Sequence, residues 1–142
     1  MNSRVAILYS GAVAPEVLTA YEQLKEELPE LGVLAITSSD QLYHEWQKTT
    51  LNSSAHGKTY KPHISQLTQS LHKDAILITI QDGHPANLSW IGSASGKVLY
   101  PLGVTEFGQS GNIPDLYRTY QIDADAIINI VARASVELTK IN

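Results

Sequence analysis

Three short patterns between residues 82 and 111 resemble parts of catalytic motifs. They are the Asp-Gly-His-Pro of residues 82–85, the Gly-Ser-Ala-Ser-Gly-Lys of residues 92–97 and the Gly-Gln-Ser-Gly of residues 108–111. The first contains an acid and a base, the second resembles a phosphate-binding loop, and the third resembles the turn that presents a nucleophilic serine. This stretch is therefore either an active site or a set of loops that position other groups.

The glycine-rich segment at residues 92–97 departs from the phosphate-binding loop in three details. That loop has four residues between its glycines, places Ser or Thr after the lysine, and leads from a strand into a helix. Here three residues intervene, Val98 follows the lysine, and an apolar strand-like run comes next. We therefore interpret the segment as a turn from a helix into a strand.

The second glycine pattern departs from the Gly-x-Ser-x-Gly of a nucleophile elbow. The glycine that should stand two residues after Ser110 comes directly after it, and Asn112 occupies the place of that glycine. A hydrolase would also need His84 and a carboxylate, Asp82 or Asp123, to approach Ser110 in space. The glycines on their own are explained by sharp turns of the backbone.

The histidines and the missing cysteines argue against a metal site. No two of the five histidines have the i, i+4 spacing of a helical zinc site. The absence of cysteine excludes disulfides, thiolate catalysis and cysteine-ligated metals. His84 differs from the other histidines because it follows a predicted strand, and functional groups collect at the carboxyl ends of parallel strands.

Strand and helix patterns alternate along the whole chain. Four apolar runs predict strands that are buried on both faces, as in a parallel sheet, and helical patterns lie between them. The chain is therefore expected to be one α/β domain, residues 1–142, built as a three-layer α/β/α sandwich. The polar residues 52–62 are expected to form an exposed loop after a short helix. The predicted strands are residues 5–9, 33–37, 75–80 and 98–104.

The composition restricts the partners and the location of the protein. Hydrophobic residues make up 43% of the 142 residues, and charged residues make up 17%. The charged share lies below the roughly 25% of an average domain, which indicates a surface covered by other domains or subunits. A net charge of −4 disfavours nucleic acid and anionic membranes as partners. No apolar run approaches the ~20 residues of a membrane span, and the N-terminus does not match a signal peptide, so a cytoplasmic location is expected.

The sequence resembles a known domain over nearly its whole length. The most specific similarity is to the transketolase C-terminal domain, which closes thiamine-diphosphate enzymes of the transketolase and 2-oxoacid dehydrogenase class. This similarity is found in residues 103–127, GVTEFGQSGNIPDLYRTYQIDADAI. The segment contains a Phe-Gly stretch, a predicted short helix and an Ile-Asp element that starts the last predicted helix. The Ser-Gly after the first strand and the Thr-Ser after the second match the same domain. The Lys-Pro-His-Ile of residues 61–64 is most similar to the homodimeric, bacterial type of pyruvate dehydrogenase, the decarboxylating component of its complex.

The resemblance implies both an architecture and a division of labour. The family domain usually begins with an additional edge strand that this chain lacks, so four parallel strands in the order 2-1-3-4 are expected. Thiamine diphosphate and magnesium belong between the diphosphate-binding and pyrimidine-binding domains of the parent enzyme, so this domain is expected to bind no cofactor or metal and to supply no catalytic residue. Its implied role is to brace a homodimer and, in some members, to contact a partner acyltransferase.

Two functions of different classes therefore remain open. One is a non-catalytic organising domain of a thiamine-diphosphate enzyme, and the other is an autonomous ligand-binding module or hydrolase that uses His84 and Ser110. For the first, residues 82–85 and 107–111 are expected to lie together at the carboxyl edge of the sheet, where Ser110 and Asn112 cap the next helix. The residues with expected interface or loop-positioning roles are Asp82, His84, Trp90, Phe107, Gln109 and Ser110.

Overall fold

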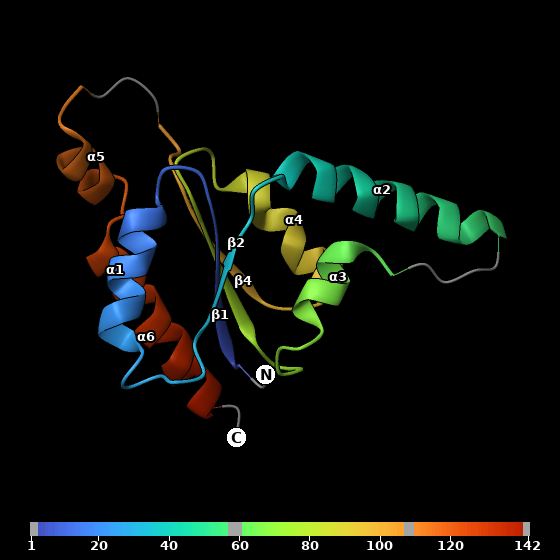
Figure 1. The fold of residues 1–142 in the computed structure, drawn as a ribbon, viewed down its shortest axis with the longest axis horizontal. Coiled ribbons are helices and arrows are strands. Elements are labelled where there is room, and N and C mark those ends of the chain that lie inside the picture. The colour runs from blue at the N-terminus through green and yellow to red at the C-terminus, as the bar shows by residue number, and fades with distance from the viewer. Residues whose placement is uncertain (1–2, 57–60, 107–109, 141–142) are drawn as a thin grey trace.

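A four-stranded parallel sheet forms the centre of the molecule (Figure 1). The structure is a computed structural model that describes residues 3–56, 61–106 and 110–140. The strand order is β2-β1-β3-β4, and β1 pairs in parallel with both β2 and β3. This confirms the predicted fold class and strand order. The strands are β1 (Val5–Ser10), β2 (Gly32–Ala35), β3 (Ile76–Gln81) and β4 (Leu99–Leu102).

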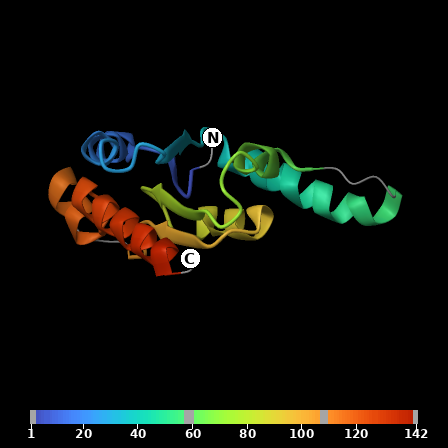
Figure 2. The same ribbon diagram turned by 90° about the horizontal axis from the view of Figure 1, so that it is seen from below.

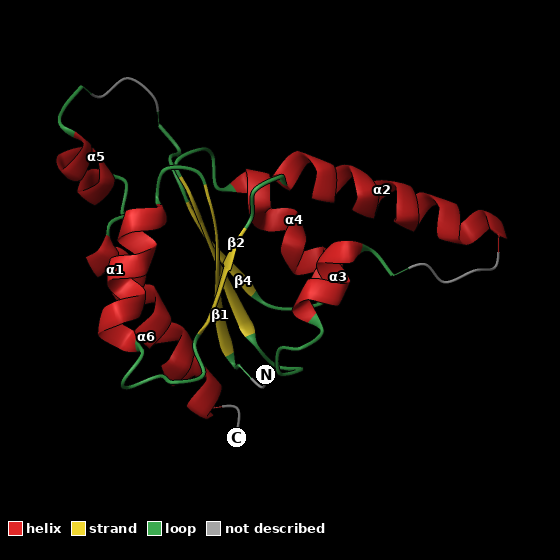
Figure 3. Ribbon diagram, viewed as in Figure 1, coloured by secondary structure: helices red, strands yellow, loops and turns green. Residues whose placement is uncertain are grey.

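Helices cover both faces of the sheet and make the molecule a three-layer sandwich (Figure 2). Helices α1 and α6 pack on one face and on each other, whereas α2, α3 and α4 form the opposite layer. Helix α5 lies beside the first turn of α1, beyond the carboxyl ends of the strands (Figure 3). The helices are α1 (Ala14–Leu24), α2 (Ser39–His56), α3 (His63–Thr68), α4 (Ala86–Ser95), α5 (Ile113–Thr119) and α6 (Ala124–Lys140). None of the helices in the described ranges is long and apolar enough to cross a membrane.

The alternation of side chains along the central strands divides the core into two clusters. Because successive side chains of a strand point to opposite faces, Ile76, Ile78 and Ile80 of β3 pack under α1 and α6. Leu77 points the other way, into the cluster beneath α3 and α4. All six residues of β3 are buried, which explains why its sequence, Ile-Leu-Ile-Thr-Ile-Gln, is mainly apolar on both faces.

The predicted exposed loop at residues 52–62 is wrong in its first part, because α2 continues to His56. Helix α2 projects beyond the body of the molecule (Figure 1), so its second half has no apolar stripe from which a helix could be recognised. The hydroxyls of Thr49 and Thr50 donate to the carbonyls of Glu45 and Trp46 one turn earlier. Residues 57–60 lie outside the described part of the chain.

A polar cluster joins the edge strand β4 to the last helix. The Tyr100 hydroxyl donates a short hydrogen bond to Glu137, and Arg133 Nε lies 3.3 Å from the Glu137 Oε1 atom. The Arg133 guanidinium carbon is also 5.7 Å from the centre of the Tyr100 ring. The hydrogen bond from Tyr100 lowers the pKa of Glu137, and the same bond raises the pKa of Tyr100. The cluster is therefore most stable while Glu137 is ionised and Tyr100 is protonated.

We predict that this cluster makes the stability of the protein depend on pH in two opposite ranges. The ordinary pKa values are 4.5 for Glu and 10.0 for Tyr. Because the pKa of folded Glu137 is depressed, its contribution is present above pH 4.5 and is lost as the pH falls through the folded value. Because the pKa of folded Tyr100 is raised, its contribution is present below pH 10.0 and is lost as the pH rises through the folded value.

Urea unfolding of the wild type and of Tyr100→Phe across the pH range measures this effect. The difference in free energy of unfolding should be largest near neutral pH and should shrink at both extremes. Glu137→Gln is the matched control, because its amide oxygen still accepts the hydrogen bond but cannot titrate, so its acid limb should disappear. A difference between wild type and Tyr100→Phe that is constant with pH contradicts the coupling.

Candidate functional site

Three loops meet at the carboxyl edge of the sheet and are joined to one another by hydrogen bonds. The Asp82 carboxylate follows β3 and accepts a hydrogen bond of 3.2 Å from the amide of Ala12, in the loop after β1. The amide of Val104, after β4, donates to the Gly83 carbonyl at 2.8 Å. A Cβ atom on Gly103 would lie 2.5 Å from the Gly83 oxygen, so the two backbones touch. The predicted position of Asp82 at this edge is therefore observed, and its carboxylate holds the loops together.

Glycine at position 11 is required by this arrangement. Gly11 has φ +85, a conformation that side-chain-bearing residues rarely adopt. A Cβ atom there would overlap the Asp82 carboxylate and lie 2.8 Å from its Cγ atom. Gly11 belongs to the Ser-Gly after the first predicted strand, and the sequence alone does not connect it with Asp82, because the two are far apart in the chain. The Ser-Gly after the first strand was the only sequence pattern that pointed to a special role for Gly11.

His84 is used to start helix α4. Its Nδ1 atom accepts a hydrogen bond of 3.1 Å from the amide of Ala86, and its carbonyl accepts one of 3.0 Å from the amide of Asn87. The side-chain amide of Gln81 also donates to the His84 carbonyl. The first amides of a helix have no partner inside the helix, so these bonds stabilise the helix start. The His84 ring is exposed, and its Nδ1 lone pair is already occupied.

Tyr117 connects α5 to the same edge. Its hydroxyl donates to the carbonyl of Ala12 at 3.5 Å, and Ala12 is the residue whose amide binds Asp82. Burial raises the pKa of Tyr117, and the negative charges of Asp82 and Glu16 raise it further. Glu16 itself accepts a hydrogen bond of 2.8 Å from the amide of Ala124 at the start of α6. Sequence analysis gave no role to Tyr117, whose partner is fixed by the fold and not by neighbouring residues.

The cap of helix α5 is Asn112. Its side chain accepts a hydrogen bond of 3.0 Å from the amide of Asp115, and Pro114 occupies the first turn as predicted. Ser110 is exposed and precedes the N-cap by two residues, so the capping role predicted for both residues is filled by Asn112. Phe107 and Gln109 lie outside the described residues, and their predicted roles remain predictions.

Trp90 belongs to an aromatic cluster between α2 and α4. Its ring stacks on that of Trp46, with centroids 5.3 Å apart and planes 26° apart, and meets the edge of Tyr43 at 5.4 Å. Trp90 and Trp46 are both half-buried. The sequence showed Tyr43 and Trp46 one helical turn apart on α2, which was the signal for an aromatic face. Trp90 therefore anchors the protruding helix to the body of the molecule.

The polar side chains at this edge are bound to the backbone. No group of three or more His, Asp or Glu side chains in the described ranges could hold a metal. The carboxylate of Asp82 and the Nδ1 of His84 are both bound to backbone amides. Chemically, the edge is suited to fixing loop positions.

The comparisons with known proteins agree with the fold. No protein-family model matches the sequence, and no curated protein matches it. Among solved structures, a transketolase from Campylobacter jejuni is similar, with a TM-score of 0.61 and 16% sequence identity. The match covers 93% of this chain and 17% of the transketolase chain. The protein therefore has a fold found within a transketolase, and it spans less than a fifth of that enzyme.

We predict that Gly11→Ala destabilises the protein more than Gly96→Ala. Both glycines have positive φ, but a Cβ atom on Gly96 meets nothing within 4 Å, whereas one on Gly11 meets Asp82. The strained backbone costs each variant about 1–2 kcal/mol, and the overlap at Gly11 should add roughly 1–3 kcal/mol. Chemical denaturation measures both values. Asp82→Ala should cost less in the Gly11→Ala background than in the wild type, and equal costs in the two backgrounds would contradict the proposed contact.

Proposed function

We propose that this chain is the C-terminal organising domain of a thiamine-diphosphate-dependent enzyme of the transketolase or pyruvate dehydrogenase type, and that it performs no chemistry itself. The observation that carries this proposal is the use of polar side chains at the carboxyl edge. Asp82 binds the amide of Ala12, and His84 binds the amide of Ala86. Groups that hold loops in place in this way suit a domain that positions its neighbours.

The choice of enzyme class rests on the fold together with the sequence. The similarity to a transketolase supports the fold of this class, and the Phe-Gly and Ile-Asp elements of residues 103–127 support the C-terminal position. The finer assignment to pyruvate dehydrogenase rests on the Lys-Pro-His-Ile segment, in which Pro62 stands at the N-cap of α3. Thiamine diphosphate, an acyltransferase partner and a cytoplasmic location belong to this proposal as properties of the parent enzyme.

A surface that other domains or a second subunit cover is part of the proposal. Several large apolar side chains are exposed, including Leu51 at 72%, Ile113 at 65% and Val98 at 58%. They lie on α2, on α5 and before β4, and the projecting end of α2 offers the greatest reach (Figure 1). Such side chains favour contact with the diphosphate- and pyrimidine-binding domains and with a second copy of the enzyme.

The competing hydrolase has weaker support. A serine nucleophile needs a base within about 3 Å whose nitrogen is free to take the proton. His84 already accepts the Ala86 amide through Nδ1, and its other partners, Asn87 and Gln81, bind its backbone carbonyl. The exposed Ser110 belongs to the segment before α5, on a different connection of the chain.

We predict that the isolated chain does not bind thiamine diphosphate tightly and does not decarboxylate pyruvate. Titration calorimetry with thiamine diphosphate and Mg²⁺ measures the first, and carbon dioxide release measures the second. No saturable heat is expected, because the sequence contains no Gly-Asp-Gly metal motif of the kind that holds the magnesium diphosphate in this class of enzymes. A dissociation constant in the micromolar range would show that this chain holds the cofactor and would overturn the proposed division of labour.

We predict that His84 acts through the start of α4 and not through proton transfer in the parent enzyme. His84→Ala removes the acceptor for the Ala86 amide and should cost about 1 kcal/mol of stability, as the loss of a helix cap does. His84→Asn keeps an acceptor but cannot act as a base, so it should restore stability and subunit assembly. Single-turnover rates should stay near the wild-type value in both variants. The single-turnover rate of Ser110→Ala should also stay near that value.

The two roles give different results in this experiment. A drop of ~10²-fold or more in the single-turnover rate of His84→Asn, with assembly and cofactor affinity unchanged, would identify general acid-base chemistry. That outcome would replace the positioning role with a catalytic one.

A further inference from the structure

The two outermost strands of the sheet, β2 and β4, differ in how their outer sides are protected. Each pairs with one neighbour, so each has an outer side on which no strand of the described chain pairs. Such an outer side binds another strand readily unless proline, charge or a covering element prevents it. Backbone groups along a strand point alternately to its two sides, so one observed hydrogen bond fixes which residues face outward.

The outer side of β4 is blocked. The carbonyl of Val98, just before β4, accepts the amide of Leu77 in β3. Tyr100 therefore faces β3 as well, and Pro101 faces outward. Proline has no amide hydrogen, so the outward row lacks a donor in its middle. The charged groups of α6 that bind Tyr100 also lie beside this strand.

The outer side of β2 has no such protection. The amide of Ile36, just after β2, donates to the carbonyl of Tyr9 in β1 at 2.7 Å. Val33 and Ala35 therefore face outward, and within the described residues their amides and carbonyls form no hydrogen bond. The strand contains neither proline nor a charged residue, and Ala35 is exposed. Alternating free donors and acceptors of this kind are complementary to another extended strand.

Apolar side chains border the outer side of β2 on both faces of the sheet. On one face α1 connects β1 with β2, whereas α6 packs on β1 and β3. Glu16 of α1 binds the start of α6, and Leu18 lies ~200° further round the helix, so it faces away from α6 and toward the side of β2. On the other face, Leu67 of α3 lines a hollow together with Leu34 of β2. Leu18 is 51% exposed and Leu67 is 36% exposed, so both are available to a partner.

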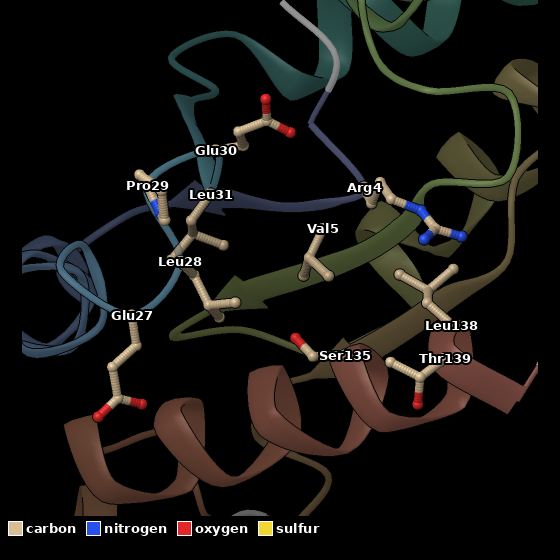
Figure 4. A pocket seen from close by; sticks show the side chains of 10 residues that line it. All are labelled: Arg4, Val5, Glu27, Leu28, Pro29, Glu30, Leu31, Ser135, Leu138 and Thr139. Atoms are coloured by element: carbon tan, nitrogen blue, oxygen red, sulfur yellow. The ribbon is translucent and has the colours of Figure 1, made fainter.

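The approach to the amino end of β2 is also bordered by apolar side chains. Leu28 and Leu31, in the connection before β2, line a hollow of about 380 Å³ together with Leu138 of α6 (Figure 4). Arg4 lines the same hollow. The surroundings of β2 are therefore largely apolar, and a partner that covers them removes apolar surface from water.

We propose that two copies of this protein pair through β2 and form a dimer whose sheet continues across a two-fold axis. In the antiparallel register centred on Leu34, Val33 of one copy lies opposite Ala35 of the other, and every outward amide and carbonyl of both strands finds a partner. This arrangement places α1 beside α1 and α3 beside α3 of the second copy, so Leu18 and Leu67 are covered. Because β4 is blocked, the sheet does not grow beyond two copies. The contact does not depend on the proposed role in a larger enzyme.

Sedimentation equilibrium of the full chain tests the proposal. A monomer–dimer equilibrium with a micromolar dissociation constant is expected, because the contact is small. Ala35→Pro removes the outward amide of each copy and leaves the bonds of β2 to β1 in place, so the dimer should weaken by roughly tenfold or more. Ala35→Ser is the matched control, because it keeps the amide and should dimerise like the wild type. A chain that stays monomeric up to millimolar concentration would leave this side of β2 to a different polypeptide and would overturn the proposal.

A single introduced cysteine tests the register, because the sequence contains none. Leu34 lies opposite Leu34 of the second copy in a non-hydrogen-bonded pair, where Cα atoms are about 4.5 Å apart, a separation that suits a disulfide. Leu34→Cys should therefore form a disulfide-linked dimer under mild oxidation. Thr37→Cys is the matched control, because Thr37 is exposed just beyond the same strand but lies opposite Leu31 of the second copy. Equal cross-linking of the two variants would indicate random collision and would overturn the proposal.

Substitutions on the flanking helices provide an independent test that leaves the strand intact. Leu18→Ser and Leu67→Ser should each weaken the dimer by roughly fivefold, because the dimer covers both leucines. Val136→Ser is the matched control, since Val136 is 53% exposed on α6 and should not affect the dimer. If thermal unfolding shows that Ala35→Pro does not fold, these variants and the cysteine pair still decide the matter. An equal loss in all three serine variants would indicate non-specific association and would overturn the proposal.

Discussion

Burial on both faces of β3 and of the first four residues of β1 is the constraint on which the rest of the structure depends. Ile7 and Ile78 are paired neighbours in the sheet, and both are 0% exposed. A parallel sheet needs crossover connections, and strands without an exposed face need helices on both sides. All strands therefore run the same way, and the loops that follow them meet at one edge.

This constraint gives the two edges of the sheet different properties. At the carboxyl edge the loops are short and tied together, as the bonds from Ala12 to Asp82 and from Val104 to Gly83 show. At the amino edge the connection from α1 to β2 leaves a cavity against the end of α6. The two edges thus differ in how their loops are joined, but both are hollowed, because a second cavity follows the carboxyl end of β2 and is lined by Ile36, Thr37, Ser38 and Gln41.

Sequence reasoning located the elements better than it located their contacts. The strands and their burial were predictable because burial on both faces leaves a short, mainly apolar run, as in β3. The strand order came from the family resemblance, since local patterns do not determine which strands become neighbours. The second half of α2 was missed because its sequence, from Gln47 to His56, is mostly polar and shows no apolar periodicity. The pairing of Trp90 with Trp46 and of Asp82 with Ala12 was missed because long-range packing decides such contacts.

The resemblance of residues 82–111 to catalytic motifs has a physical cause that does not require catalysis. A chain that leaves a buried strand must turn sharply and then satisfy the first amides of the next helix. Glycine permits the turn, and short side chains with an acceptor atom satisfy the amides, as His84 and Asn112 do here. Active sites at the same edge draw on the same residue types, so composition at a strand end cannot distinguish the two cases. What distinguishes them is the use of the acceptor atoms, and one carboxylate oxygen of Asp82 and the Nδ1 atom of His84 are bound to backbone amides.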